Sequence, residues 1–437
     1  MQAIALILKD LGHEVSGSDN RYDDFYSMLT SRGIKVDLSP NFDKISNSDL
    51  VIYSIAVKPT NPEFQFAKAS NVKMLSRTEF LSEFQKEFAN VIAVSGTHGK
   101  STTTYLIASL MSSARLEATY HIGAGSERFT GGGKYDGKEY LVSEACEYRD
   151  SFLAFRPTIG IVLNIEKDHP DYFKDLNQIE DSFVKFAANI VDYGLLITGI
   201  KYYELFKNGL ESLGRKDIRI MTIGEGGDYQ AKNITVFNGK PSFDVYYKDE
   251  MLYRVNLNLY GEYNEYNALA AIAAARYYDI ESNVILETLE NIGGLNRRFQ
   301  YAGKCNEAKI IVDYAHHPSE IKAVIETAKS ITYGKLVVCF QPHTYSRTTA
   351  LFEQFVHSFD NADEVIITKT YRSRETKNGK TSFDLFLELS KGKDNVSYYD
   401  DFLSIVKYLQ CELKEEDTLL ICGAGNVNEI ANLIKNK

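Results

Sequence analysis

Short apolar runs separated by polar, helix-forming stretches recur along the chain. Up to residue 88, apolar positions with helical spacing at 3–12 precede strand-like runs at 14–19 and 49–54, and a second helix is expected to open at Asn61-Pro62. Strands and helices in close succession are typical of a parallel α/β layer. Such layers usually begin with a strand and a glycine-rich turn, whereas this chain opens inside a helix. We therefore expect this layer to lack its first strand.

A second α/β segment follows and then changes character. Polar and apolar residues alternate between 224 and 259, which indicates antiparallel strands. An alanine-rich helix is expected at 267–278, and the glycines at 293–294 mark a hinge. The buried strands predicted in this segment lie at 91–95, 140–143 and 158–163.

A third segment returns to the α/β pattern. Polar residues cluster just after its strands, where open parallel sheets bind their ligands. We expect an α/β fold of three domains, at 1–88, 89–294 and 295–437. The strands predicted in the third domain lie at 310–313, 336–340, 364–367 and 418–421.

The composition fits a globular chain with a large core, since 44% of the 437 residues are hydrophobic and 25% are charged. Lysine and arginine number 49 and aspartate and glutamate 59, so the net charge of −10 argues against a large nucleic-acid-binding surface. No apolar run reaches the roughly 18 residues of a membrane span, and the N-terminus lacks the features of a signal peptide. Scattered cysteines without a C-x-x-C pair suit a reducing compartment. We expect a cytoplasmic protein.

A glycine-bearing loop stands between the strand predicted at 91–95 and the helix after it. Glycines let backbone N–H groups close around phosphate oxygens, and the helix N-terminus adds positive potential. Lys100 is expected to reach the β- and γ-phosphates, and the Ser101 hydroxyl to ligate Mg²⁺. The strict Walker A pattern would need glycine at Val94, so an ordinary glycine turn is the alternative. The loop residues are Gly96, Thr97, His98, Gly99, Lys100, Ser101 and Thr102.

Two pairs of polar residues follow predicted strands near this loop, Glu144 with Glu147 and Asp168 with His169. Carboxylate, hydroxyl and imidazole groups at neighbouring strand ends suit Mg²⁺ bound to ATP phosphates. Clustered acids also need a cation, because like carboxylates repel. Taken singly, each of these residues is more simply interpreted as a surface residue at the start of a loop. Their joint placement favours metal binding. Of the two glutamates, Glu147 is the weaker candidate.

The hinge and the third domain add further polar groups. Arg297 and Arg298 place two cations where a closing domain can reach phosphates, and a solvated charge pair is the alternative. His316 and His317 precede a proline and either carry chemistry or form a helix-entry turn. The stretch 341–347 mixes several donor types after a strand. The sequence C-G-A-G-N after the last strand is interpreted as a tight strand-to-helix turn rather than a dinucleotide fingerprint.

Taken in order, these motifs resemble those of the Mur ligases along nearly the whole chain. Together they are far more specific than the phosphate loop alone. The segments that carry the resemblance are VSGSD, SGTHGKSTT, SEACEYRDSFL, NIEKDHPDYF, YGEYNEYNALAAIAAA, LNRRFQY, VDYAHHPSEI, FQPHTYSRT and ICGAGN.

The resemblance implies a UDP-binding Rossmann-like domain, a central P-loop ATPase domain and a C-terminal Rossmann-like domain. It implies an ATP-dependent reaction that joins L-alanine to the carboxylate of UDP-N-acetylmuramate through an acyl phosphate. The family's first strand and glycine-rich turn have no counterpart here, in line with the helix at the start. Cys146, Tyr263 and Thr344 depart from the family's usual residues and bear on amino-acid selectivity.

The resemblance also assigns roles to single residues. It places Asn264 and Asn267 at the adenine and Asp313 near the ribose of ATP, and it places Ser101, Glu144 and His169 at the metal. It places Arg297 among the residues that bind ATP. It also places Arg297, with other residues of the third domain, among the groups that close over the acyl phosphate and the amino acid. The expected catalytic residues are Lys100, Glu144, His169, Arg298, His316 and Arg347.

Three functions stay open at this point. The first is the L-alanine-adding ligase. The second is a related ligase that adds another amino acid or a peptide, and the third is a non-catalytic nucleotide-binding protein, because the glycine-rich turn is missing. ATP and Mg²⁺ are the expected cofactors, UDP-N-acetylmuramate and L-alanine the expected partners, with neither nucleic acid nor membrane. The sequence does not give the oligomeric state.

Overall fold

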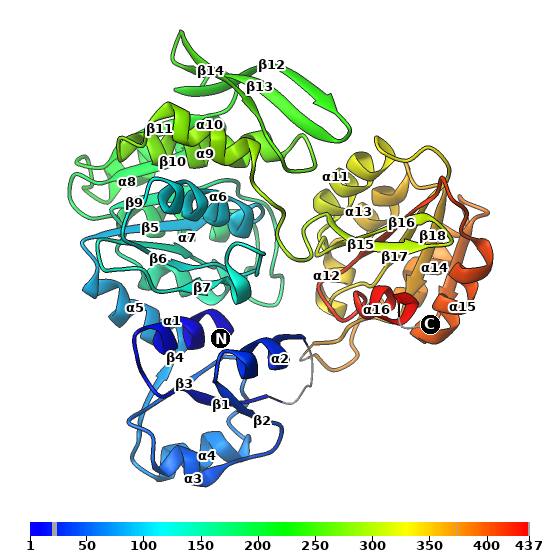
Figure 1. Ribbon diagram of the computed structural model, residues 1–437, viewed down its shortest axis with the longest axis horizontal. Coiled ribbons are helices and arrows are strands. Elements are labelled where there is room, and N and C mark those ends of the chain that lie inside the picture. The colour runs from blue at the N-terminus through cyan, green and yellow to red at the C-terminus, as the bar shows by residue number, and fades with distance from the viewer. Residues whose placement is uncertain (20–23, 374, 436–437) are drawn as a thin grey trace.

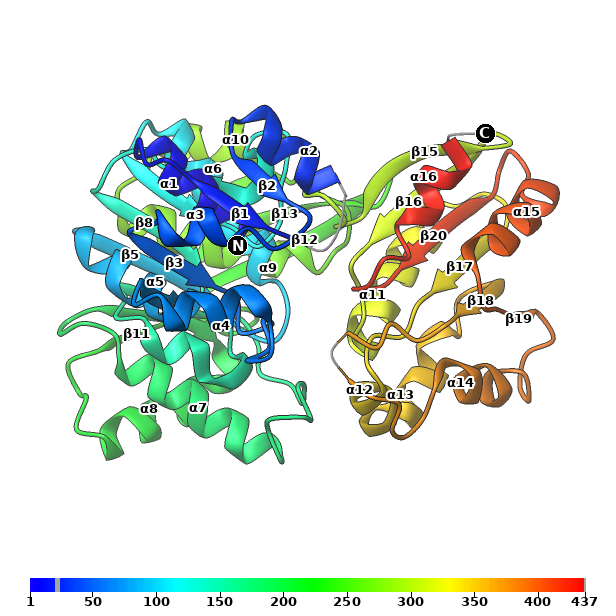
Figure 2. The same ribbon diagram turned by 90° about the horizontal axis from the view of Figure 1, so that it is seen from below.

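The protein is an α/β structure in three parts, shown as a computed structural model in Figure 1, which describes residues 1–19, 24–373 and 375–435. The N-terminal part lies below the central part in that view, and the C-terminal part stands to the right. A view turned by 90° again sets the C-terminal part apart from the other two (Figure 2). The predicted α/β class and the order of the three parts are confirmed. Among the described residues, no helix has the length and apolarity to cross a membrane.

The N-terminal part contains two separate pairs of parallel strands rather than one continuous sheet, β1 with β2 and β3 with β4. The predicted opening helix is present, as is the helix capped by Asn61. The elements are α1 (Gln2–Asp10), β1 (Ser16–Ser18), α2 (Asp24–Ser31), β2 (Lys35–Asp37), α3 (Phe42–Ser46), β3 (Leu50–Tyr53), α4 (Pro62–Ala69), β4 (Lys73–Ser76), α5 (Arg77–Phe84) and η1 (Gln85–Glu87).

Helix α1 packs onto the central part. Its buried Ile4 and Ile7 belong to the same hydrophobic cluster as Val91 and Leu141 of the central sheet. The backbone of α1 approaches strand β7 so closely that a Cβ at Gly133 would overlap the carbonyl of Ala3. The first two parts therefore share one core.

The central part is a ten-stranded sheet in the order β14-β13-β12-β11-β10-β9-β5-β8-β6-β7. Strand β5 lies between β8 and β9, with Val94 opposite Glu144 and Ser95 opposite Val162. The loops that follow these three parallel strands therefore leave the sheet at one edge, where ligands bind in such folds.

Strands β12 to β14 pair antiparallel and lie within 224–259, as predicted. Helix α9 begins at Asn264, earlier than the predicted 267, and its buried alanines allow close packing on α6. No strand is predicted from the sequence at β6, β10 or β11, although β10 is a short, largely apolar run, LLITG. The strands are β5 (Asn90–Ser95), β6 (Ala118–His121), β7 (Gly133–Lys134), β8 (Tyr140–Glu144), β9 (Ile159–Val162), β10 (Leu195–Gly199), β11 (Arg219–Ile223), β12 (Tyr229–Phe237), β13 (Lys240–Tyr247) and β14 (Glu250–Asn256). The helices and 3₁₀ turns are α6 (Lys100–Ser113), η2 (Thr130–Gly132), η3 (Tyr148–Ala154), α7 (Leu176–Ala188), η4 (Ile200–Tyr202), α8 (Tyr203–Ser212), α9 (Asn264–Tyr277) and α10 (Ser282–Glu290).

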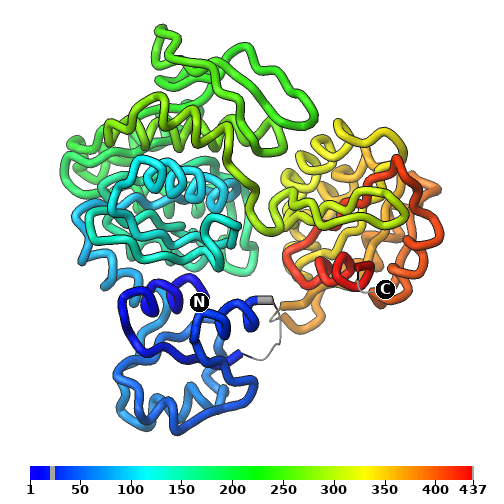
Figure 3. The backbone as a smooth tube through the Cα atoms, viewed as in Figure 1, coloured from blue at the N-terminus to red at the C-terminus, as the bar shows by residue number. Residues whose placement is uncertain are grey.

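The C-terminal part is a six-stranded sheet in the order β15-β16-β20-β17-β18-β19, with only the edge pair β15–β16 antiparallel. One stretch of chain enters it after α10 (Figure 3), and on the way Leu295 bridges back to Ser126 of the central part. The four predicted strands are present. The elements are β15 (Gln300–Cys305), β16 (Ala308–Asp313), α11 (Pro318–Lys329), β17 (Leu336–Phe340), α12 (Tyr345–Ala350), α13 (Phe352–Val356), η5 (His357–Phe359), β18 (Glu364–Thr368), α14 (Ser382–Leu389), β19 (Val396–Tyr399), α15 (Phe402–Glu412), β20 (Thr418–Cys422) and α16 (Glu429–Lys435).

Candidate active site

The predicted phosphate loop connects the end of β5 to the start of α6 at Lys100. Gly96 and Gly99 have φ angles of 136° and 84°, which L side chains rarely adopt. A Cβ at Gly99 would also overlap the Oδ1 atom of Asn267 on α9. Both glycines are therefore required for the shape of the loop. Ser101 follows inside the first turn of α6 and is buried, and Thr102 lines the cavity described below.

Lys100 folds back over this loop. Its Nζ atom donates hydrogen bonds to the carbonyl oxygens of Gly96 and Thr97, at 2.5 and 3.0 Å, and lies 2.9 Å from Glu147. Burial alone would lower the pKa of Lys100, but the Glu147 carboxylate, together with Cys146 and Glu144, outweighs burial and raises the pKa. The loop thus holds a permanent cation where phosphate oxygens would lie.

Glu147 joins Lys100 to His169. The carboxylate is 3% exposed and lies 3.6 Å from the Nε2 atom of His169. Burial would raise the pKa of Glu147, but Lys100 and His169 together lower it. Glu144, the glutamate that the sequence favours, instead accepts a 2.5 Å hydrogen bond from the backbone N–H of Gly123. In the described residues, it is therefore Glu147 rather than Glu144 that contacts the lysine of the loop.

The residues around Lys100 fit a magnesium ion by their chemistry. Ser101 supplies a hydroxyl, and Glu144 and Glu147 supply carboxylates, the oxygen donors that suit Mg²⁺. His169 adds an imidazole nitrogen. Gly123 makes room for the Glu144 carboxylate, since a Cβ there would lie 2.6 Å from one of its oxygens. Glu144 also acts electrostatically on both Lys100 and Arg298.

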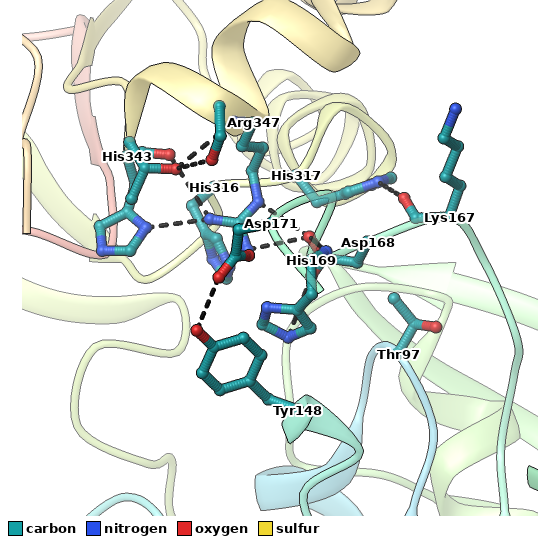
Figure 4. A network of polar contacts seen from close by, with 12 residues as sticks. Thr97, Tyr148, Lys167, Asp168, His169, Asp171, His316, His317, His343 and Arg347 are labelled. Carbon is teal, nitrogen blue, oxygen red and sulfur yellow. Dashed lines mark hydrogen bonds and ion pairs between the residues drawn. The ribbon is translucent and has the colours of Figure 1, made fainter. Parts of the chain in front are cut away.

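A network of polar side chains connects this edge of the sheet to the C-terminal part (Figure 4). Arg347 lies 2.8 Å from the Asp168 carboxylate, and both side chains are less than a tenth exposed. Arg347 also lies 2.9 Å from the Nδ1 atom of His343. Burial would raise the pKa of Asp168, but Arg347 holds it well below its usual range. Burial lowers the pKa of His316, which stands next to this network, to about 4.

The two arginines of the hinge have different surroundings. Arg297 donates two hydrogen bonds, to the carbonyl oxygens of Gly423 at 2.5 Å and Gly425 at 2.9 Å, so its guanidinium holds the turn after β20. Arg298 is surrounded by acids: burial would lower its pKa, but Glu320 and Asp313 raise it. Arg298 therefore keeps its charge beside the cavity, whereas Arg297 is committed to the turn.

A cavity of about 1350 Å³ separates the central and C-terminal parts. Asn264 and Asn267 lie on one helix and hydrogen-bond each other at 2.8 Å. Asp313 accepts hydrogen bonds from the backbone N–H groups of Phe299 and Ala315, and burial raises its pKa to about 6. The cavity thus brings together many of the predicted residues, and its lining includes His98, Gly99, Thr102, Asn264, Asn267, Arg298, Asp313, Ser319 and Glu320.

Three family models match the chain in succession. The Mur ligase family catalytic domain matches residues 1–89, the Mur ligase middle domain 94–275, and the Mur ligase glutamate ligase domain 297–425. The chain belongs to the Mur ligase family. As a member of this family it is a ligase.

Full-length relatives agree with this assignment. The chain is 42% identical over 442 residues to the UDP-N-acetylmuramate–L-alanine ligase of Caldicellulosiruptor bescii, covering all of this chain and 96% of that protein. It is 38% identical over 435 residues to the enzyme of the same name from Clostridium novyi, covering 99% of this chain and 94% of that protein.

Solved structures of Mur ligases have the same architecture. The UDP-N-acetylmuramate–alanine ligase of Thermotoga maritima superposes with a TM-score of 0.84 at 26% identity, covering 100% of this chain and 96% of that one. A murein peptide ligase from Psychrobacter arcticus has a TM-score of 0.74 at 22% identity, covering 99% and 95%. The second match supports the fold alone.

Sequence reasoning undervalued several residues of this Mur ligase site. Glu147 was the weaker candidate from the sequence, because no spacing rule shows which of two glutamates in an irregular turn contacts Lys100. Glu320 accepts hydrogen bonds from the backbone N–H groups of His316 and His317. The helix-entry turn that the sequence offered for His316-His317 is thus present, with His317 as the cap of α11, while Glu320 also contacts the phosphate loop at His98.

Proposed function

We propose that this Mur ligase joins L-alanine to the carboxylate of UDP-N-acetylmuramate, using ATP and passing through an acyl phosphate, to supply a peptidoglycan precursor. The names of the relatives that match over nearly their full length support this reaction. The observation that carries the proposal is the grouping of Lys100, Glu147 and His169 at a phosphate loop beside the interdomain cavity. We place the reaction in the cytoplasm, where a reducing medium keeps the five free cysteines as thiols.

ATP would bind with its phosphates at the loop and its adenine near Asn264 and Asn267, with Asp313 toward the ribose. Ser101, Glu144 and His169 would hold Mg²⁺, and the position of Glu147 adds a fourth candidate. When bound, the ion would neutralise charge on the phosphates and orient the γ-phosphoryl group for transfer.

The chain's own residues account for the remaining demands of the reaction. A carboxylate is a poor acylating agent, so phosphoryl transfer from ATP must first convert it to an acyl phosphate. Lys100 and Arg298 would stabilise the negative charge that spreads over the transferred group. The amine of L-alanine then attacks the acyl carbon; the C–O bond to phosphate breaks, inorganic phosphate leaves, and the nitrogen loses a proton to give the amide. Cations such as Arg347 near His316 would orient the amino acid. Closure of the C-terminal part over the cavity would exclude water that hydrolyses the intermediate.

The test is the release of inorganic phosphate by the purified full-length chain with ATP and Mg²⁺. The proposal predicts release that requires both UDP-N-acetylmuramate and L-alanine, with stoichiometric formation of the alanylated sugar nucleotide by mass spectrometry. Other L-amino acids and short peptides are assayed at the same sugar nucleotide concentration. Faster phosphate release with any of them than with L-alanine would overturn the assignment of L-alanine. Phosphate release at the same rate without UDP-N-acetylmuramate would overturn the reaction itself.

A further inference from the structure

A second group of metal-ligating side chains lies between the central and C-terminal parts, apart from the expected magnesium ligands. His98 and Glu166 come from the loops after β5 and β9, and His317 precedes α11. Their ligand atoms lie within 4.8 Å of one another. The Oε2 atom of Glu166 is 3.4 Å from Nε2 of His98 and 3.9 Å from Nδ1 of His317. Within the described residues, no other three His, Cys, Asp or Glu side chains meet in this way.

Both imidazoles are oriented by a partner on their far side. The Nδ1 atom of His98 lies 2.9 Å from the Glu320 carboxylate. The Nε2 atom of His317 lies 3.3 Å from the backbone carbonyl of Lys167, the contact drawn as a dashed line in Figure 4. Each ring thus has an acceptor for one N–H, and its other nitrogen faces the group. Histidines that bind metals typically have this outer support. The Nδ1 atom of His317 also accepts a long hydrogen bond, 3.4 Å, from the Ser319 backbone N–H as the cap of α11.

Ser319 lies among the three side chains. Its Oγ atom is 2.8 Å from Nδ1 of His317, 3.2 Å from Nε2 of His98 and 3.1 Å from Oε2 of Glu166. A hydroxyl has one proton and can donate to one acceptor. The remaining lone pairs need a second proton or a cation between them.

We propose that His98, Glu166 and His317, with Ser319 beside them, bind a transition-metal ion of the Zn²⁺ class that bridges the central and C-terminal parts. Two imidazole nitrogens and one carboxylate form a donor set that Zn²⁺ takes, with metal–ligand distances of about 2.0–2.2 Å. Such bonds set ligand atoms about 3.3 Å apart in a tetrahedral site. Glu166, at 3.4 and 3.9 Å from the two imidazole nitrogens, needs only a small inward movement, and the two imidazoles, whose ligand atoms lie within 4.8 Å of each other, would also have to move together. His98 also belongs to the phosphate loop, but metal binding can be measured without turnover, because Lys100, Glu144 and His169 take no part in this group.

The experiment is a titration of the purified full-length chain with Co²⁺, whose visible absorption reports four- or five-coordinate binding, followed by displacement with Zn²⁺. Wild type is expected to bind one ion in this way. His317→Gln and Glu166→Gln should each weaken binding at least about tenfold. The matched control is His357→Gln, since His357 is exposed and lies in η5, outside the group. Circular dichroism melts establish that each variant is folded.

Ser319→Cys tests the geometry by a gain instead of a loss. A thiolate at this position would complete a site with two histidines, one carboxylate and one sulfur, which should tighten Zn²⁺ binding at least about tenfold and add a near-ultraviolet sulfur-to-cobalt band. Equal Co²⁺ affinity in wild type, His317→Gln and Glu166→Gln would assign any bound ion to other residues and overturn the proposal. If wild type binds no Co²⁺, the proposal is also overturned. A protonated His98, which can donate to both Glu166 and Glu320, would then account for the contacts between these side chains.

Discussion

The two sides of the cavity are built in different ways. On the central side, the phosphate loop comes from one continuous piece of chain, residues 95–102, shaped by two glycines and the start of α6. The opposite side collects Arg298, Asp313 and Glu320 from separate elements of the C-terminal part. The loop side depends on local backbone geometry, whereas the opposite side depends on how the C-terminal part is held. Substitutions on the two sides should therefore impair the protein in different ways.

The largest effect is expected for Lys100→Ala on the loop side. Removing the cation leaves Glu147 buried without its ion-pair partner and removes charge stabilisation of phosphoryl transfer. We expect phosphate release to fall at least about 10³-fold. The control is Lys391→Ala, whose side chain is 70% exposed and whose rate should equal that of wild type. A Lys100→Ala variant with more than a tenth of the wild-type rate would contradict the role given to the loop.

Asp168→Asn should break the link between the two sides. It leaves the buried Arg347 without its carboxylate, a change that costs about 3–5 kcal/mol when such pairs are opened. Because the folded-state pKa of Asp168 is lowered, wild type gains this stability above about pH 4 and loses it as pH falls through the lowered value. At pH 7 the variant should melt at a lower temperature than wild type. This difference in melting temperature should become much smaller in acid.

The control for this change is Asp192→Asn, because Asp192 is 86% exposed and lies 3.3 Å from Arg215. It should alter the free energy of unfolding by less than about 1 kcal/mol. Equal melting temperatures for the two variants at pH 7 would mean that the Asp168–Arg347 pair does not hold the C-terminal part in place.

A smaller effect is expected for Gly99→Ala. The added Cβ meets Asn267 Oδ1 and forces alanine into a positive φ. We expect a loss of about tenfold in ATP affinity, measured by calorimetry, with the fold retained. Gly392→Ala is the matched control, because no described atom lies within 4 Å of the Cβ position there. Unchanged ATP affinity in Gly99→Ala would separate the loop from nucleotide binding.

The smallest effect concerns Glu265, which lines the cavity from α9. Burial and the neighbouring Glu262 raise its pKa to about 7, and one carboxylate oxygen has no hydrogen-bond partner among the described residues. An acid with a raised folded-state pKa loses stability as pH rises through that value. Glu265→Gln should therefore stabilise the unliganded chain by about 1 kcal/mol at pH 8 and less at pH 5. Glu290→Gln, at an exposed position, should show no such pH dependence.

The loop side could be predicted from the sequence because its signals are local. A run of apolar residues, two glycines and a lysine lie next to one another, and strand, loop and helix follow from them. The parallel strands β5, β8 and β9 then place Glu144 and His169 at the same edge as Lys100 without further information.

The interdomain contacts could not be predicted in this way. Asp168 and Arg347 are 179 positions apart, and His98 and Glu320 are 222 apart. No spacing rule relates residues on different sheets, because their distance depends on how the two parts pack. The contact of Glu147 with Lys100 could not be predicted for a related reason: Glu144 ends β8 and Glu147 follows it, and only the irregular turn into η3 decides which of them faces Lys100.

The shared core under α1 has a consequence for motion. Because Ile4, Ile7 and the close approach at Gly133 join the first two parts, these parts should translate and rotate as one body during turnover. The single connection after α10 then becomes the natural pivot, and opening of the cavity would swing the C-terminal part alone. Paired spectroscopic labels on α3 and α8 should report a constant separation, while a label on α15 should move relative to both.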